Sequence, residues 1–162
     1  MKIKSLLIVL LMVVGFVSAN EVLALGVGSR VPSVSLPILT KPSKHVNLAG
    51  IRAKYVYIDF WASWCSSCRS SLPRLSRAAG ALSKKGLRVV GVNLDKDPQK
   101  GIDFMRKYGV SFLNLSDPKG ASASRFGLPK IPSAFLVKDG RVVKAFYGYS
   151  GADVNKLYSL VQ

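Results

Sequence analysis

The sequence predicts an α/β domain in which a mixed β-sheet carries helices on both faces. Two apolar runs rich in β-branched residues, 55–61 and 87–94, are each followed by a segment with helical spacing. Two later strand-like runs flank Asp139-Gly140, a dipeptide typical of a tight hairpin turn. The order β-α-β-α followed by β-β-α combines parallel and antiparallel strands, so we expect one mixed sheet.

The N-terminal half of this order follows from local signals. Residues 28–50 are rich in Pro, Ser and Lys, which predicts an irregular extension or a hairpin. The run 55–61 has six apolar or aromatic residues out of seven, which indicates a buried strand. Apolar residues recur at helical spacing over 65–85, and Gly86 then ends the predicted helix. The run 87–94 predicts a second buried strand.

The C-terminal half contains shorter elements. Pro98 is a good first residue for a helix, and Gly109 a good terminator, so we expect a helix between them. The remaining expected elements are a strand at 112–115, a helix at 121–126, hairpin strands at 134–137 and 142–147, and a closing helix at 152–160.

Residues 1–19 have the pattern of a signal peptide. Two lysines near the N-terminus precede a nearly continuous apolar run over 6–17, and small residues permit cleavage after Ala19. The alternative is an uncleaved anchor, which would keep the chain in contact with the membrane. No Cys lies directly after the apolar run, which excludes a lipoprotein anchor. In both cases we expect the folded domain, residues 28–162, to lie outside the cytoplasmic membrane, in the bacterial periplasm.

The composition excludes several kinds of site. The 162 residues contain 2 Cys and one His, His45, too few for a disulfide-dense scaffold, a four-cysteine zinc site or a multi-histidine metal centre. Lys and Arg number 24 against 8 for Asp and Glu, a formal charge of +16. The basic residues are scattered, and export argues against a nucleic-acid partner. We interpret most of this charge as a solubilising surface, and we expect no metal.

The two cysteines form the clearest chemical pattern. Cys65 and Cys68 follow the first buried strand and lie where the next helix starts. Cysteines at this spacing can close a disulfide, and a helix N-terminus stabilises a thiolate. A structural disulfide or half of a zinc site are the alternatives. A bridge this short removes little chain entropy, and zinc would need further ligands, so redox chemistry is favoured.

The stretch Asp59-Phe60-Trp61-Ala62-Ser63-Trp64-Cys65-Ser66-Ser67-Cys68 closely resembles the active site of the thioredoxin superfamily. Together with the exported setting and the extension, it is similar to the TlpA/ResA/CcmG-type thiol:disulfide oxidoreductases. Segments 89–95 and 131–140 agree with this resemblance. It implies a thioredoxin-like fold with a central mixed β-sheet flanked by helices, an N-terminal extension and an insertion before a cis-proline loop. Residues 110–130 have the length for that insertion.

The resemblance also implies residue roles. Cys65 matches the attacking thiol, and Cys68 matches the resolving thiol that releases a mixed disulfide. Trp64 matches the tryptophan that covers the disulfide. Pro132 matches the loop proline that is cis beside the two cysteines. The backbone of Ile131 would then pair with an extended substrate segment.

Asp59 is a candidate general base. It lies in an otherwise apolar strand, and burial would raise the pKa of its carboxyl. Such a group could accept the Cys68 proton during resolution. Asp59 matches the buried Asp of thioredoxin itself. The alternative is a side chain turned toward a local polar pocket or solvent. Alternation along the strand places Asp59 on the face opposite to Val56, Ile58 and Phe60.

These observations predict an exported thiol:disulfide oxidoreductase that reduces disulfides in extracytoplasmic proteins, with cytochrome c maturation as one setting. The expected partners are protein thiols or disulfides and a membrane-bound electron donor, and the Cys65–Cys68 disulfide replaces any bound cofactor. The alternatives are an oxidant of the same fold and a non-catalytic binding module. Ser66-Ser67 and 128–130 depart from the family patterns. The redox direction therefore stays open, and the cytochrome role is weakened.

Overall fold

The computed structural model describes residues 24–148 and 153–161. The predicted signal peptide, residues 1–19, and the expected first residue of the closing helix, Ala152, lie outside these ranges. Within the described residues, no helix is long and apolar enough to cross a membrane.

The centre of the fold is a seven-stranded mixed sheet with the order β2-β1-β5-β4-β3-β6-β7. β3 is parallel to β4 and antiparallel to β6, and β4 is parallel to β5. The predicted mixed sheet is therefore confirmed. The strands are β1 (Ser35–Ile38), β2 (Lys41–Asn47), β3 (Tyr55–Trp61), β4 (Leu87–Asn93), β5 (Leu113–Ser116), β6 (Ser133–Lys138) and β7 (Arg141–Tyr147).

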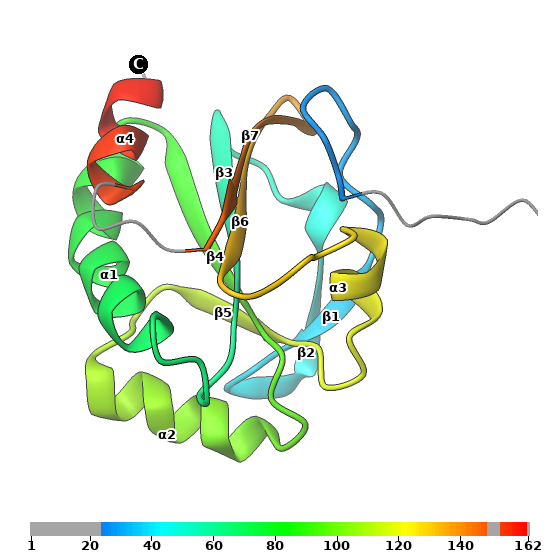
Figure 1. Ribbon diagram of the computed structural model, residues 1–162, viewed down its shortest axis with the longest axis vertical. Coiled ribbons are helices and arrows are strands. Elements are labelled where there is room, and N and C mark those ends of the chain that lie inside the picture. The colour runs from blue at the N-terminus through cyan, green and yellow to red at the C-terminus, as the bar shows by residue number, and fades with distance from the viewer. Residues whose placement is uncertain (1–23, 149–152, 162) are drawn as a thin grey trace, which may run out of the picture.

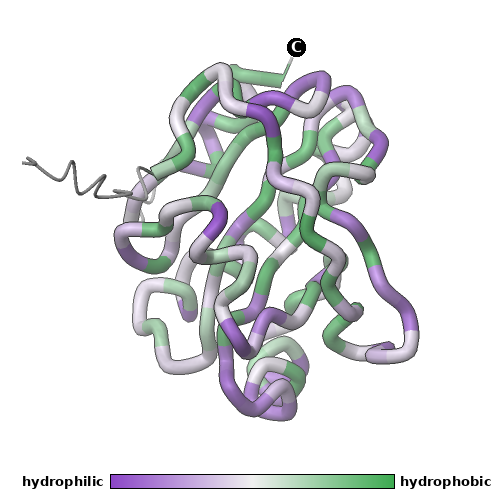
Figure 2. Tube along the Cα trace, turned by 90° about the vertical axis from the view of Figure 1, so that its right-hand side faces the viewer, coloured by the Kyte–Doolittle hydropathy of each residue, from purple (hydrophilic) through white to green (hydrophobic). Residues whose placement is uncertain are grey.

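Helices cover both faces of this sheet (Figure 1). Two of them, α1 and α4, lie together against one face, whereas α3 lies on the other side. Figure 2 shows hydrophobic segments running through the middle of the trace, with many hydrophilic segments at its outer turns. The helices are α1 (Cys68–Lys84), α2 (Pro98–Tyr108), α3 (Ala121–Arg125) and α4 (Asp153–Leu160), with a 3-10 turn at Leu48–Gly50.

β3 is buried along its whole length because it has a strand on each side and packed side chains on both faces. Val56, Ile58 and Phe60 belong to the core cluster on one face. Tyr57 packs with side chains of α1 and α4 on the other face. The predicted alternation is thus confirmed, and it turns Asp59 toward the face that carries α1 and α4.

The turn residues act as the sequence indicated. Gly86 and Gly109 have φ values of 83° and 66°, which only residues without a Cβ adopt easily, and each follows the end of a helix. Asp139 and Gly140 also have positive φ and join β6 to β7. The hairpin β1–β2 lies within residues 28–50, and β1 extends the sheet by pairing with β5.

One boundary differs at a place that matters for chemistry. The sequence predicted a helix from residue 65, but α1 begins at Cys68. Cys65 lies in the preceding turn, where its N–H donates to the carbonyl of Ala62 at 3.1 Å. The helical N–H groups therefore start at Cys68 and point back toward Cys65.

Candidate active site

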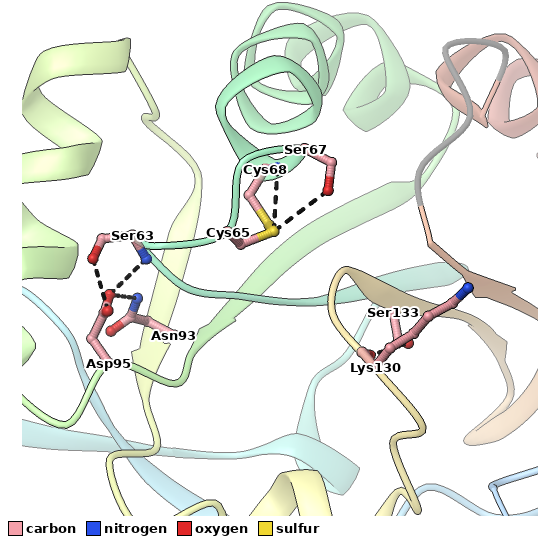
Figure 3. Close-up of a disulfide and its surroundings, with 8 residues drawn as sticks. All are labelled: Ser63, Cys65, Ser67, Cys68, Asn93, Asp95, Lys130 and Ser133. Atoms are coloured by element: carbon pink, nitrogen blue, oxygen red, sulfur yellow. Dashed lines mark hydrogen bonds between the residues drawn. A yellow bond between two sulfur atoms is a disulfide. The ribbon is translucent and has the colours of Figure 1, made fainter.

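The two cysteines lie between the carboxyl end of β3 and the first turn of α1, and they form a disulfide (Figure 3). Their Cα atoms are 5.3 Å apart. Cys65 is 6% exposed, whereas Cys68 is 0% exposed. Both cysteines are thus largely buried in the disulfide form, and Cys65 is the less buried of the two.

Two hydrogen-bond donors point at the sulfur of Cys65 (Figure 3). The backbone N–H of Cys68 lies 3.3 Å from Cys65 Sγ, and the hydroxyl of Ser67 lies 3.5 Å from it. A disulfide sulfur carries no proton, so the Ser67 hydroxyl is the donor. Both groups would bind a thiolate at Cys65 more strongly than a neutral sulfur, because hydrogen bonds to charged acceptors are stronger.

The turn before Cys65 is anchored by Asp95, which is 1% exposed. Its carboxylate accepts the backbone N–H of Ser63 at 2.9 Å and the Ser63 hydroxyl at 2.8 Å (Figure 3). It also accepts the side-chain N–H of Asn93 at 2.7 Å. These bonds join the active-site turn to the end of β4. Sequence reasoning assigned no role to Asp95, although a carboxylate directly after a buried strand was the available signal.

Trp61 supports the same turn from inside. Its indole N–H donates to the side-chain oxygen of Asn114 on β5 at 2.7 Å. Gly91 makes room for this contact, since a Cβ there would overlap the Asn114 oxygen and lie 2.9 Å from Trp61 Nε1. The active-site turn therefore rests on side chains from three adjacent strands.

The cis-proline loop lies on the other side of the disulfide. The Ile131–Pro132 bond is cis, as the resemblance implied. Ser133 donates its hydroxyl to the carbonyl of Lys130 at 2.6 Å and so holds the loop (Figure 3). Within residues 24–148 and 153–161, the backbone of Ile131 forms no backbone hydrogen bond. Trp64 is 65% exposed beside Cys65, so its indole offers apolar surface at the site.

Asp59 is 4% exposed, and burial together with the nearby charge of Asp153 raises the pKa of its carboxyl from 3.8 to about 7. Burial also raises the pKa of Tyr57 well above its usual value, and the charges of Asp59 and Asp153 act in the same direction. Burial is the larger cause for both groups. Near neutral pH, Asp59 therefore exists in both protonation states, as a general acid or base requires.

Asp59 lines a small cavity of about 20 Å³ together with Tyr57, Ser71 and Asp153. Asp59 Oδ1 and the hydroxyl of Ser71 form no hydrogen bond with the described residues. A cavity of this volume has room for one water molecule. Ser71 lies three residues after Cys68 on the same face of α1, so the cavity lies about one helical turn from Cys68.

Sequence reasoning placed Asp59 correctly in the strand but missed Asp153 and Ser71. Asp153 comes from α4, near the opposite end of the chain, and nothing in its local sequence signals a role. Among residues 24–148 and 153–161, no group of His, Cys, Asp and Glu could hold a metal ion.

Comparison with known proteins assigns the family. The Redoxin family matches residues 26–161. The chain is 27% identical over 149 residues to the thiol-disulfide oxidoreductase ResA of Bacillus subtilis, covering 89% of this chain and 82% of that protein. It is 32% identical over 115 residues to the thiol:disulfide interchange protein DsbE of Xylella fastidiosa, covering 70% of this chain and 56% of that protein.

A solved structure agrees with these relatives. The crystal structure described as a thiol:disulfide interchange protein DsbE from Chlorobium tepidum superposes with a TM-score of 0.76 at 33% identity. The match covers 84% of this chain and 95% of that chain. The chain therefore belongs to the Redoxin family, as a ResA/DsbE-like thiol:disulfide oxidoreductase of the thioredoxin superfamily.

Proposed function

We propose that this protein is exported and reduces disulfides in extracytoplasmic proteins through Cys65 and Cys68. The observation that carries the proposal is the difference in exposure between the two cysteine residues, 6% for Cys65 and 0% for Cys68. The less buried cysteine, whose sulfur has two hydrogen-bond donors around it, suits the attacking thiolate. A buried sulfur suits the resolving thiol, because no external disulfide can reach it.

The reaction proceeds in two exchanges. The Cys65 thiolate attacks a substrate disulfide, which forms a mixed disulfide and releases one substrate thiolate. Cys68 then attacks the sulfur of Cys65, which forms the Cys65–Cys68 disulfide and releases the second substrate thiolate, which takes a proton from solvent. Two electrons pass to the substrate. In this scheme Asp59 accepts the proton of Cys68 and later returns it to solvent.

The surroundings of the disulfide support binding of a protein substrate. Trp64 supplies exposed apolar surface beside Cys65. The backbone of Ile131, held by the cis bond to Pro132, can pair with an extended segment of the substrate. A membrane-bound electron donor would return the pair to the dithiol form, and no other cofactor is needed. Cytochrome c maturation is one setting for such a reductant.

Variants of the two cysteines test this assignment. The reduced protein should reduce the disulfides of insulin, and Cys65→Ser should abolish the reaction because a hydroxyl is a far weaker nucleophile than a thiolate. Cys68→Ser should trap mixed disulfides with partner proteins, since nothing resolves them. A binding module would reduce nothing. Normal turnover by Cys68→Ser with trapping by Cys65→Ser would invert the roles.

A second candidate function is oxidation of protein thiols by the same pair. The two donors at Cys65 Sγ favour it, because they stabilise the reduced form and so raise the reduction potential. A redox titration against glutathione separates the two directions. A potential near that of thioredoxin, about −270 mV, supports the reductant, and one near about −120 mV supports the oxidant.

A further inference from the structure

A groove of about 670 Å³ begins beside the disulfide at Ser67 and extends to β7 and α4. Three of its lining residues are lysines from three different segments. Lys130 comes from the cis-proline loop, Lys144 from β7 and Lys156 from α4. The amine of Lys130 lies against Gly148, 3.4 Å from the position that a Cβ there would take. The groove therefore has three lysines and one acidic residue, Asp153, in its lining, and it reaches Ser67, whose hydroxyl contacts Cys65 Sγ.

Two of the three lysines of this groove have no acidic partner among the described residues. Lys156 pairs with Asp153 at 3.6 Å. Among the described residues, no carboxylate lies within salt-bridge distance of Lys130 or Lys144. All three lysines are exposed. Exposed ammonium groups on a concave wall attract an anionic ligand and raise its local concentration.

The surface on the other side of the active site is also positively charged. A second groove of about 290 Å³ begins at Ser63 and carries Arg69, Lys100 and Lys107. Its one acidic residue, Asp103, pairs with Arg106 at 3.5 Å. A substrate polypeptide that lies across Cys65 would therefore meet positive charge on both sides of the substrate's disulfide.

We propose that the groove of Lys130, Lys144 and Lys156 receives an acidic, extended segment of the substrate protein, adjacent to the disulfide that Cys65 attacks. This inference rests on the proposed function. A polypeptide fits because the groove continues from the Ile131 loop, where an extended backbone can pair. Carboxylates in that segment would replace the missing partners of Lys130 and Lys144.

Reduction of two matched peptides by the dithiol protein tests the proposal. Each peptide contains one intrachain disulfide, flanked by glutamates in one peptide and by lysines at the same positions in the other. Rates are divided by the rate of the same variant toward hydroxyethyl disulfide, which is small and uncharged. This division separates docking from the reactivity of Cys65.

The groove variant is Lys130→Glu/Lys144→Glu, which leaves Lys156 and its partner Asp153 unchanged. The control variant is Lys41→Glu/Lys44→Glu, on exposed positions of β2. Both variants change the net charge equally. β2 and β7 form opposite edges of the sheet, so only the groove variant alters the surface next to the active site. Lys130→Gln/Lys144→Gln serves as a milder variant, with an intermediate effect expected.

The parent protein should prefer the acidic peptide about tenfold at low salt, and added salt should reduce this preference. The groove variant should lose or reverse the preference, whereas the control should keep most of it. Equal rates for the two peptides would overturn the inference while leaving the proposed function intact. An equal loss in the control would assign the preference to net charge and overturn the groove. A parent that reduces no disulfide, including hydroxyethyl disulfide, would overturn the proposed function itself.

Discussion

The hydroxyl of Ser67 should set part of the reduction potential. It is half-buried and lies 3.5 Å from Cys65 Sγ. Reduction places negative charge on that sulfur, which strengthens the hydrogen bond. Because this bond stabilises the reduced form more than the disulfide, Ser67→Ala should make the protein a stronger reductant.

The magnitude follows from the strength of a charge-assisted hydrogen bond, about 1.5–3 kcal/mol. The long distance and partial exposure of Ser67 favour the lower end of this range. A change of about 1.4 kcal/mol corresponds to about 30 mV for a two-electron couple, or a tenfold change in the equilibrium constant. The potential of Ser67→Ala should therefore be about 30 mV more negative than that of the parent.

The assay is equilibration with defined ratios of reduced and oxidised glutathione, followed by alkylation of the free thiols. Ser66→Ala is the matched control, because Ser66 is exposed and its side chain forms no hydrogen bond to the sulfur. Its potential should equal that of the parent. An unchanged potential in Ser67→Ala, or the same change in both variants, would refute the idea that this hydroxyl acts on the sulfur.

The carboxylates around the site give three further predictions. The raised pKa of Asp59 means that the folded state binds a proton more tightly than the unfolded state, so stability falls as the pH rises from about 4 to about 7. Above about pH 7, the free energy of unfolding of Asp59→Asn, measured by urea denaturation, should thus exceed that of the parent by up to about 4 kcal/mol. Below about pH 4 the two proteins should be nearly equally stable. A difference that does not change with pH would contradict this. Asp153→Asn removes a charge that raises the pKa of Asp59, so the midpoint of the pH dependence of mixed-disulfide release should move to lower pH. An unchanged midpoint would show that Asp153 does not influence this step. Asp95→Ala leaves the N–H of Ser63 without its buried acceptor and should cost about 3 kcal/mol in urea denaturation; a loss below about 0.5 kcal/mol would show that the turn is held in another way.

Much of the fold could be predicted because its signals are local. The strand Tyr55–Trp61 has the predicted bounds, since an uninterrupted apolar run with β-branched residues specifies a buried strand by itself. Gly86 and Gly109 follow the ends of their helices as expected, because a left-handed residue is the simplest way to end a helix. The start of α1 could not be placed, since Ser66 and Ser67 permit both a turn and a helix.

The sequence by itself determined the sheet, the helices and the position of the cysteine pair, because these depend on residue period, on turn residues and on motif spacing. The resemblance carried by those residues indicated the redox chemistry. Only the tertiary structure decided what surrounds them. It brought Asp153 of α4 next to Asp59 of β3, and it collected Lys130, Lys144 and Lys156 into one groove beside the disulfide. Such contacts join residues far apart in the chain, and the packing of helices on the sheet sets their distances, which no local pattern encodes.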